Sequence, residues 1–186
     1  MIEGENEFMT DVLFYQNYTY VADISAIVLC IICWLLLHSS YTVREKSLII
    51  FKAGTVCLMM ATVCSISFHT AITRITESRK ILIYVLQDGI YLLLILTFVL
   101  LCNYFGTLLK LEERPARLLG AVSWGGYAVF AFLEIGSPFT HLGFYIDADL
   151  MVHQNFYFDP FRFAYIYYCI ILVVVLFTYR KKFVLK

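Results

Sequence analysis

The 186-residue chain is poor in charged residues and in proline, of which it has three. Only 15% of its residues are Asp, Glu, Lys or Arg and 61% are hydrophobic, whereas about a quarter of a soluble domain is charged. The mean hydropathy is +0.79. This composition excludes an ordinary soluble domain and predicts an all-α integral membrane bundle. The length allows about five spans and leaves no room for a soluble catalytic domain.

Motifs of catalysis and cofactor binding are also missing. The chain has no glycine-rich phosphate loop, no serine elbow and no HExxH sequence. Cys30 and Cys33 form a C-x-x-C pair, but it lies inside an apolar segment, where we interpret both residues as small packing groups. No two of the four histidines lie three or four residues apart. We therefore expect no enzymatic activity, metal or cofactor in this chain, and nothing indicates a nucleic-acid partner.

Basic residues are absent from the first nineteen positions, which carry four acidic residues. A cleaved secretory signal begins with a basic region, so this segment is not typical of one. We interpret residues 1–19 as an extracytoplasmic tail.

Five apolar segments follow, each near the length of a membrane-spanning helix. A polar turn, TRITESRK, separates the second from the third, and a loop broken by Pro115 separates the third from the fourth. Residues 136–162 are expected to form an outer, non-helical lid, and residues 180–186 a cytoplasmic tail or the start of a linker. The predicted spans are residues 20–37, 48–72, 81–104, 118–135 and 163–179.

Basic residues predict the orientation of the bundle. With the N-terminus outside, ten of the fourteen Lys and Arg residues lie on the cytoplasmic side. The positive-inside rule then favours an outside N-terminus and a cytoplasmic C-terminus. The second connection is an exception to this rule, because it places Arg74, Arg79 and Lys80 outside. We predict a multi-pass membrane protein in this orientation.

The acidic residues and the histidine inside the predicted spans all fall in the outer half, whereas Lys52 lies close to the cytoplasmic end. A charged group at mid-membrane costs about 2.5 to 3.5 kcal/mol on insertion scales, so such groups usually face the bundle interior and mark a site. We expect an outward-opening pocket under the lid, to which His141 and the lid aromatics contribute. The alternative is that Asp23, His69 and Glu134, which lie near the membrane interface, are hydrated and have no function. The predicted ligand-binding residues are Asp23, His69, Asp88, Glu134, His141 and Tyr145, with Phe144, Phe156 and Tyr157 beside them.

The fourth predicted span is rich in small residues. Ala121 and Gly125 form a small-xxx-small pair, flanked by Gly120 and Gly126. Such a pattern lets two helices approach closely and is compatible with a homodimer.

The sequence GSPFTHLGFYID at the start of the lid resembles a known class of membrane sensor regions. These multi-span regions precede diguanylate cyclase or phosphodiesterase domains in Firmicutes, and a related seven-span region begins some histidine kinases. The matching positions are Ser137, Pro138, Thr140 and His141 in the turn, and Phe144, Tyr145 and Asp147 in the segment after it.

The resemblance implies an input domain that relays a small-molecule or envelope signal to a cytoplasmic output domain beyond Lys186. That domain would turn over cyclic-di-GMP or act as a histidine kinase. Two other classes remain open from the residues themselves. One is a small transporter or channel that uses Asp88 and Glu134 as ion carriers, and the other is an accessory membrane anchor.

Overall fold

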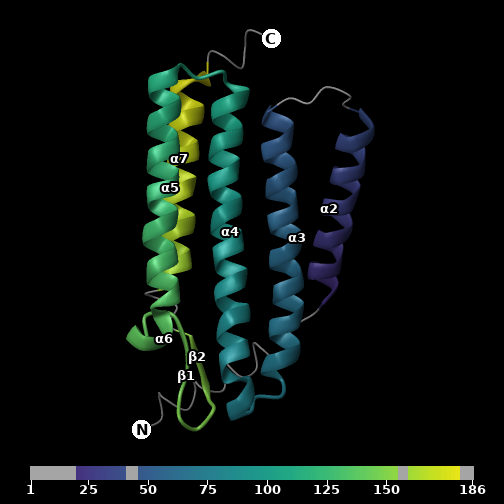
Figure 1. Cartoon of the computed structure of the whole chain (residues 1–186), viewed down its shortest axis with the longest axis vertical. Helices are drawn as coiled ribbons and strands as arrows, with labels where there is room; N and C mark the ends of the chain where they lie inside the picture. Colours follow the sequence, from purple (N-terminus) through teal and green to yellow (C-terminus); the bar gives the residue numbers. More distant parts are fainter. Residues whose placement is uncertain (1–19, 41–45, 155–158, 181–186) are drawn as a thin grey trace.

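The computed structural model describes residues 20–40, 46–154 and 159–180. The chain forms a bundle of long helices with a short helix and a two-stranded hairpin at one end (Figure 1). The all-α helical bundle predicted from composition is therefore confirmed. The tail at residues 1–19 and residues 181–186 lie outside the described part. The long helices are α2 (Val21–Ser40), α3 (Lys46–Ile72), α4 (Lys80–Leu108), α5 (Glu113–Ile135) and α7 (Pro160–Thr178).

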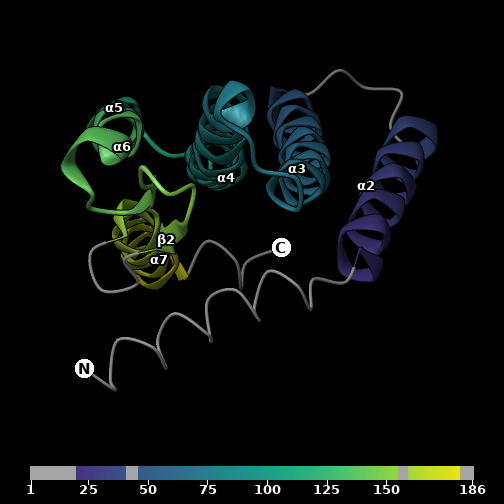
Figure 2. The same ribbon diagram turned by 90° about the horizontal axis from the view of Figure 1, so that it is seen from below.

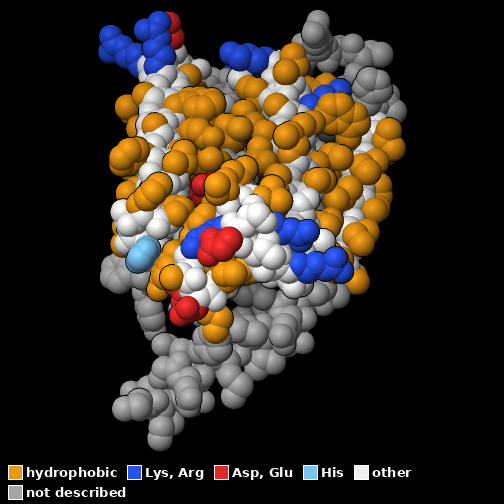
Figure 3. Space-filling model, turned by 60° about the horizontal axis from the view of Figure 1, so that its bottom comes forward, with side chains coloured by type: hydrophobic (Ala, Val, Ile, Leu, Met, Phe, Trp, Pro, Cys, Tyr) orange, Lys and Arg blue, Asp and Glu red, His pale blue; other side chains and the backbone are white. Residues whose placement is uncertain are grey.

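Four of these helices, α3, α4, α5 and α7, are long and apolar enough to cross a membrane. In α2 the apolar part, Val21–Leu36, is shorter, so the count of five spans stays a prediction. Large apolar side chains are exposed on the bundle, among them Phe132 at 78% and Phe177 at 69%. Hydrophobic side chains cover the helical face in Figure 3, and charged ones gather towards its two ends. This is the surface of a multi-pass membrane protein.

Consecutive long helices run in opposite directions, because each short connection returns the chain along its predecessor (Figure 1). Seen from the end, α2, α3 and α4 follow one another, and α5 and α7 lie beyond α4 (Figure 2). α4 contacts α3, α5 and α7. The hairpin lies at the end where α3 and α5 finish and α4 and α7 begin, which we call the hairpin end.

The main core lies between α4, α5 and α7. Tyr168 is fully buried, and its hydroxyl donates a 2.7 Å hydrogen bond to the carbonyl of Ser123. Gly126 permits this close approach, because a Cβ atom there would lie 2.4 Å from Cε1 of Tyr167. A Cβ atom on Gly120 or Gly125 would meet nothing within 4 Å. One glycine of the predicted small-residue group therefore packs against a neighbour inside the chain.

The connection between α4 and α5 is shorter than the sequence predicted. The prediction placed a loop broken by Pro115 between residues 104 and 118, but α4 continues to Leu108 and α5 begins at Glu113. Pro115 lies in the first turn of α5, where a backbone N–H has no partner within the helix in any case. The proline therefore starts the helix and does not break it.

The lid also contains more regular structure than predicted. Residues 137–140 form one helical turn, α6 (Ser137–Thr140), which has Pro138 near its start. The turn ends at His141, whose φ of 56° is the left-handed conformation that commonly terminates helices. Strands β1 (Phe144–Ile146) and β2 (Val152–Gln154) follow as an antiparallel pair.

Candidate functional site

The hairpin is built on a tight contact between its first residues and α6. Ser137 is 1% exposed, and its hydroxyl donates a 3.3 Å hydrogen bond to the carbonyl of Phe144. A Cβ atom on Gly143 would lie 2.6 Å from Oγ of Ser137, so a larger residue at 143 would disrupt this contact. The sequence SPFTHLG thus fixes where β1 begins.

The inner face of β1 packs on α3 and α4. Alternating strand residues point to opposite faces, and Phe144 and Ile146 are both buried. The ring of Phe144 lies 5.6 Å from that of Phe68 and 5.8 Å from that of Tyr84, with edge-on geometry in both contacts. These contacts attach the hairpin to the ends of two helices far from it in sequence.

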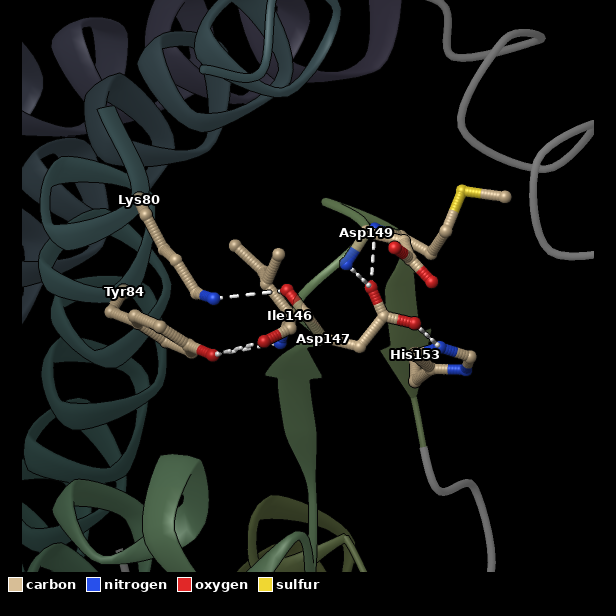
Figure 4. A network of polar contacts seen from close by, with 7 residues as sticks. Lys80, Tyr84, Ile146, Asp147, Asp149 and His153 are labelled. Carbon is tan, nitrogen blue, oxygen red and sulfur yellow. Dashed lines mark hydrogen bonds and ion pairs between the residues drawn. The ribbon is translucent and has the colours of Figure 1, made fainter. Parts of the chain in front are cut away.

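Polar contacts between α4 and the strand complete this attachment (Figure 4). The hydroxyl of Tyr84 accepts a 2.7 Å hydrogen bond from the amide of Ile146 and lies 3.4 Å from the carbonyl of the same residue. The ammonium of Lys80 donates a 2.9 Å hydrogen bond to the carbonyl of Asp147. Two side chains of α4 therefore bind the backbone at the end of β1.

The opposite face of the hairpin carries a stack of three rings. Tyr145 lies between His141, at 4.3 Å between ring centroids, and His153, at 4.8 Å, and both pairs are nearly parallel. The strand register places Tyr145 opposite His153. Because Tyr145 alternates with the buried Phe144 and Ile146, the two predicted site residues His141 and Tyr145 lie on the face of β1 that points away from α4.

Asp147 organises the turn between the strands. Its Oδ1 accepts hydrogen bonds from the amides of Asp149, at 3.0 Å, and Met151, at 2.8 Å, while Oδ2 lies 3.0 Å from Nε2 of His153 (Figure 4). The hydrogen bond from His153, followed by that from the Met151 amide, lowers the pKa of Asp147. The turn is thus closed by an ionised carboxylate.

A second acidic group lies deeper, where α4, α5 and α7 meet. Glu134 is 1% exposed, and its Oε2 has no hydrogen-bond partner. It interacts electrostatically with Asp159 and with Asp88. Asp159 is 3% exposed and caps α7, accepting a 2.9 Å hydrogen bond from the amide of Phe161. Carboxylates from three separate elements therefore share one buried region.

A cavity of about 470 Å³ adjoins this region. Asp88 is on its wall, together with Lys80 and Tyr84 from α4 and Ile146 from β1. The other side is formed by the end of α5 and by α6, including Phe139. The cavity thus lies between α4, the α5–α6 corner and the hairpin, and it is the hollow that best matches the predicted pocket.

Asp23 and His69 form a separate pair on α2 and α3. Their charges interact, and Nδ1 of His69 lies 2.8 Å from the carbonyl of Ser65. Oδ2 of Asp23 is buried without a hydrogen-bond partner. Neither residue lines the cavity beside Asp88.

The six predicted site residues therefore fall into three groups. The structure brings Asp88 together with Glu134, Asp23 with His69, and His141 with Tyr145. Phe156 and Tyr157, expected beside them, lie outside the described residues. Sequence reasoning missed Lys80, Tyr84, His153 and Asp159 as part of these groups.

One of the missed residues had a local signal. Asp159 precedes Pro160, and an Asp directly before a proline that begins an apolar segment is typical of a helix N-cap. The other three depend on contacts across 62 or more residues, or across a hairpin whose register the sequence did not reveal.

Within residues 20–40, 46–154 and 159–180, no three His, Cys, Asp or Glu side chains are placed to hold a metal ion together. All six cysteines are free thiols. In comparisons with protein-family models, curated proteins and solved structures, the chain matches none. The function must therefore be inferred from the geometry of the site.

Proposed function

We propose that this chain is a membrane-embedded input module, which detects a ligand or envelope condition at the hairpin end and relays it to a cytoplasmic output domain. The observation that carries this proposal is the position of the 470 Å³ cavity. Its walls come from α4, from the α5–α6 corner and from β1. A ligand in the cavity would contact all three and would change their relative positions.

The route from the cavity to the far end of the bundle runs through α7. The hairpin joins α5 to α7, which begins at Pro160 directly after the buried cap Asp159. α7 then packs on both α4 and α5, with Ala164, Tyr168 and Val175 in the main core and the hydroxyl of Tyr168 hydrogen-bonded to the carbonyl of Ser123. A shift of the hairpin would displace the start of α7, and tight packing would carry the displacement along the helix.

The relay works as a population shift between two packings of α7 against α4 and α5. A ligand moves such an equilibrium only by the difference between its affinities for the two packings. The cavity is suited to this role because its walls belong to the parts that would move. The proposed orientation places the hairpin end outside a bacterial cytoplasmic membrane, with α7 leading to a cyclic-di-GMP or histidine kinase domain.

The test measures the output of the natural full-length protein, as cyclic-di-GMP turnover or autophosphorylation, in membranes. Asp88→Asn on the cavity wall and His141→Ala in the ring stack are expected to change the output while membrane insertion stays normal. Ser67→Ala on α3 serves as a control, because its hydroxyl bonds only within its own helix. Unchanged output from both site variants, or a full-length protein without an output domain, would contradict the proposal.

A cation or proton carrier is the second candidate, favoured by one observation. The carboxyl of Glu134 is buried and has an unpartnered oxygen, and buried acidic groups mark proton and ion relays in membrane proteins. Further along α4, however, the polar side chains form hydrogen bonds within their own helix. The donors are Thr97, Asn103 and Thr107, and the acceptors are backbone carbonyls of α4. A flux assay in proteoliposomes decides, since a carrier would move ions or protons faster than its Glu134→Gln variant does.

A further inference from the structure

The connection between α3 and α4 carries positive charge at the hairpin end, where the positive-inside rule does not predict it in the proposed orientation. Residues 73–80 hold three basic residues, Arg74, Arg79 and Lys80, and one acidic residue, Glu77, a net charge of +2. Arg74, Glu77 and Arg79 are exposed, whereas Lys80, the first residue of α4, is half-buried. A basic residue at the start of a membrane-spanning helix lies at the level of the lipid head groups.

Lys80 also lines the cavity between α4, the α5–α6 corner and the hairpin. Its ammonium donates its 2.9 Å hydrogen bond to the backbone carbonyl of Asp147, which is uncharged (Figure 4). The carboxylate of Asp147 points away from Lys80 and is held by His153 and two amides of the turn. Lys80 forms no ion pair with any of the described residues. Because an ammonium has three N–H groups, Lys80 can donate further hydrogen bonds at the cavity wall.

The cavity forms a groove that opens towards the lipid-facing surface of the bundle. Ile81 on one side is 76% exposed and Phe139 on the other is 88% exposed, and both line the groove. Val85, one turn along α4 from Ile81, is 61% exposed and lines it too. The volume of about 470 Å³ lies within the range of roughly 300 to 1,000 Å³ found for small-molecule sites. The groove therefore leads from a lysine at its rim to hydrocarbon that continues into the bilayer.

Asp88 is the other ionisable residue of the groove wall, and it lies deeper. It follows Lys80 by eight residues, so the two are about 12 Å apart along the axis of α4. The groove is therefore balanced in charge as a whole, with its basic group at the rim and its acidic group at depth. A ligand with a negative head group would be held at the rim by Lys80, because Asp88 repels an anion from the deeper end.

We propose that the groove binds an anionic phospholipid, with its phosphate on the ammonium of Lys80 and one acyl chain along Ile81, Val85 and Phe139. The lysine ammonium is a compact charge that binds phosphate, and a charged acceptor forms a stronger hydrogen bond than a neutral carbonyl does. The exposed basic residues of residues 73–80 attract anionic lipids to the same connection. The positive charge that is an exception to the positive-inside rule thus belongs to a lipid site.

A phosphate at Lys80 would act on the hairpin. The same ammonium holds the carbonyl of Asp147 at the end of β1, so the phosphate competes with one of the attachments between α4 and the hairpin. Tyr84, which bonds to the backbone of Ile146, would then hold the hairpin with less support. As the ligand class of an input module, this inference rests on the proposed function, but the lipid site itself is tested separately.

The binding test uses the chain in phosphatidylcholine nanodiscs with a single tryptophan at the mouth of the groove, made by Trp34→Phe, Trp124→Phe and Phe139→Trp. The probes are a phosphatidate and a phosphatidylcholine that each carry one 9,10-dibromostearoyl chain, whose bromines quench tryptophan fluorescence on contact. The two probes share the phosphate and the acyl chains and differ in net charge. We expect the phosphatidate to bind about fivefold more tightly, equivalent to about 1 kcal/mol.

The variants of this test separate loss of charge from loss of fold. Lys80→Gln should remove the preference for phosphatidate, while unchanged quenching by the phosphatidylcholine probe shows that the mouth of the groove is intact. Lys80→Arg keeps the charge and should retain the preference. Lys46→Gln removes an exposed basic residue at the far end of the bundle and should also retain it. Asp88→Asn should not lower the preference, because Asp88 does not hold the head group.

Three results would overturn the inference. The first is equal quenching by the two probes in the parent chain, and the second is a preference for phosphatidate that survives Lys80→Gln undiminished. The third is release of the phosphatidate probe by inorganic phosphate as effectively as by unbrominated phosphatidate, since the acyl chain would then contribute nothing to binding.

Failure of this inference and failure of the proposed function give different results. If phosphatidate binds through Lys80 but leaves the output of the full-length protein unchanged, the lipid site stands and the input module is wrong. If Asp88→Asn and His141→Ala change the output while phosphatidate shows no preference for the groove, the module stands and the ligand class is wrong.

Discussion

The hydroxyl of Tyr84 on α4 accepts a 2.7 Å hydrogen bond from the backbone amide of Ile146, 62 residues later in the chain. This contact attaches the hairpin to the bundle at a point where Phe144 and Ile146 also bury their side chains. It lies at the wall of the cavity, which Tyr84 and Ile146 both line. This hydrogen bond is therefore one of the contacts that link the position of the hairpin to the shape of the cavity.

Replacing Tyr84 with Phe should loosen this attachment. The ring contact with Phe144 remains, but the Ile146 amide loses its acceptor, a loss of about 1 kcal/mol for a typical hydrogen bond. Hydrogen exchange should show the Ile146 amide exchanging about fivefold faster. Tyr104→Phe on the same helix is the control, and an equal change in both variants would contradict the assignment.

Acidification should open the turn between β1 and β2. The folded state lowers the pKa of Asp147 below its ordinary value of 3.8, chiefly through the hydrogen bond from His153. The stabilisation is therefore fully present above 3.8 and is lost as the pH falls through the lowered pKa. This loss of stabilisation is measured by the hydrogen-exchange protection of the Asp149 and Met151 amides, compared between about pH 6 and about pH 3.

The variant Asp147→Asn supplies the control for this pH effect. Its amide side chain cannot ionise, so the exchange of the two turn amides should be fast already at neutral pH and should vary less on acidification. A turn whose protection falls equally in the parent and in the variant would show that another group titrates.

Enlarging Gly126 should destabilise the contact between α5 and α7. A methyl group there would lie 2.4 Å from the ring of Tyr167, and overpacking of this kind costs about 1 to 3 kcal/mol. Gly126→Ala should therefore lower the thermal stability of the chain in detergent. Gly125→Ala is the matched control, because no atom lies within 4 Å of its added methyl and its melting temperature should not fall. Equal melting temperatures for Gly126→Ala and Gly125→Ala would show that Tyr167 moves aside without a loss of stability.

Hydropathy predicted the helices well because every membrane-spanning helix needs a run of apolar residues of similar length. The predicted spans at 48–72 and 118–135 end at the residues where α3 and α5 end. The exception at Pro115 has a local cause, since a proline in a first helical turn and a proline in a loop look alike in sequence.

The site was harder to predict because depth in the membrane does not tell which way a side chain points. Asp88 and Glu134 were placed in the outer half, and they do interact. Asp23 and His69 have a similar expected depth but sit on a different pair of helices. His141 and Tyr145 do not join Asp88 at the cavity. The alternation of side chains along β1 turns Tyr145 away from the cavity wall that Ile146 forms.

We propose that the hairpin end controls the packing of α7 at the far end of the bundle. Spin labels at Leu108 and Phe177, both exposed and near the far ends of α4 and α7, report this packing as a distance distribution in nanodiscs after the native cysteines are replaced. We expect Tyr84→Phe to shift the population between two distances, while Tyr104→Phe leaves it unchanged. Superimposable distributions for the parent and Tyr84→Phe would contradict it.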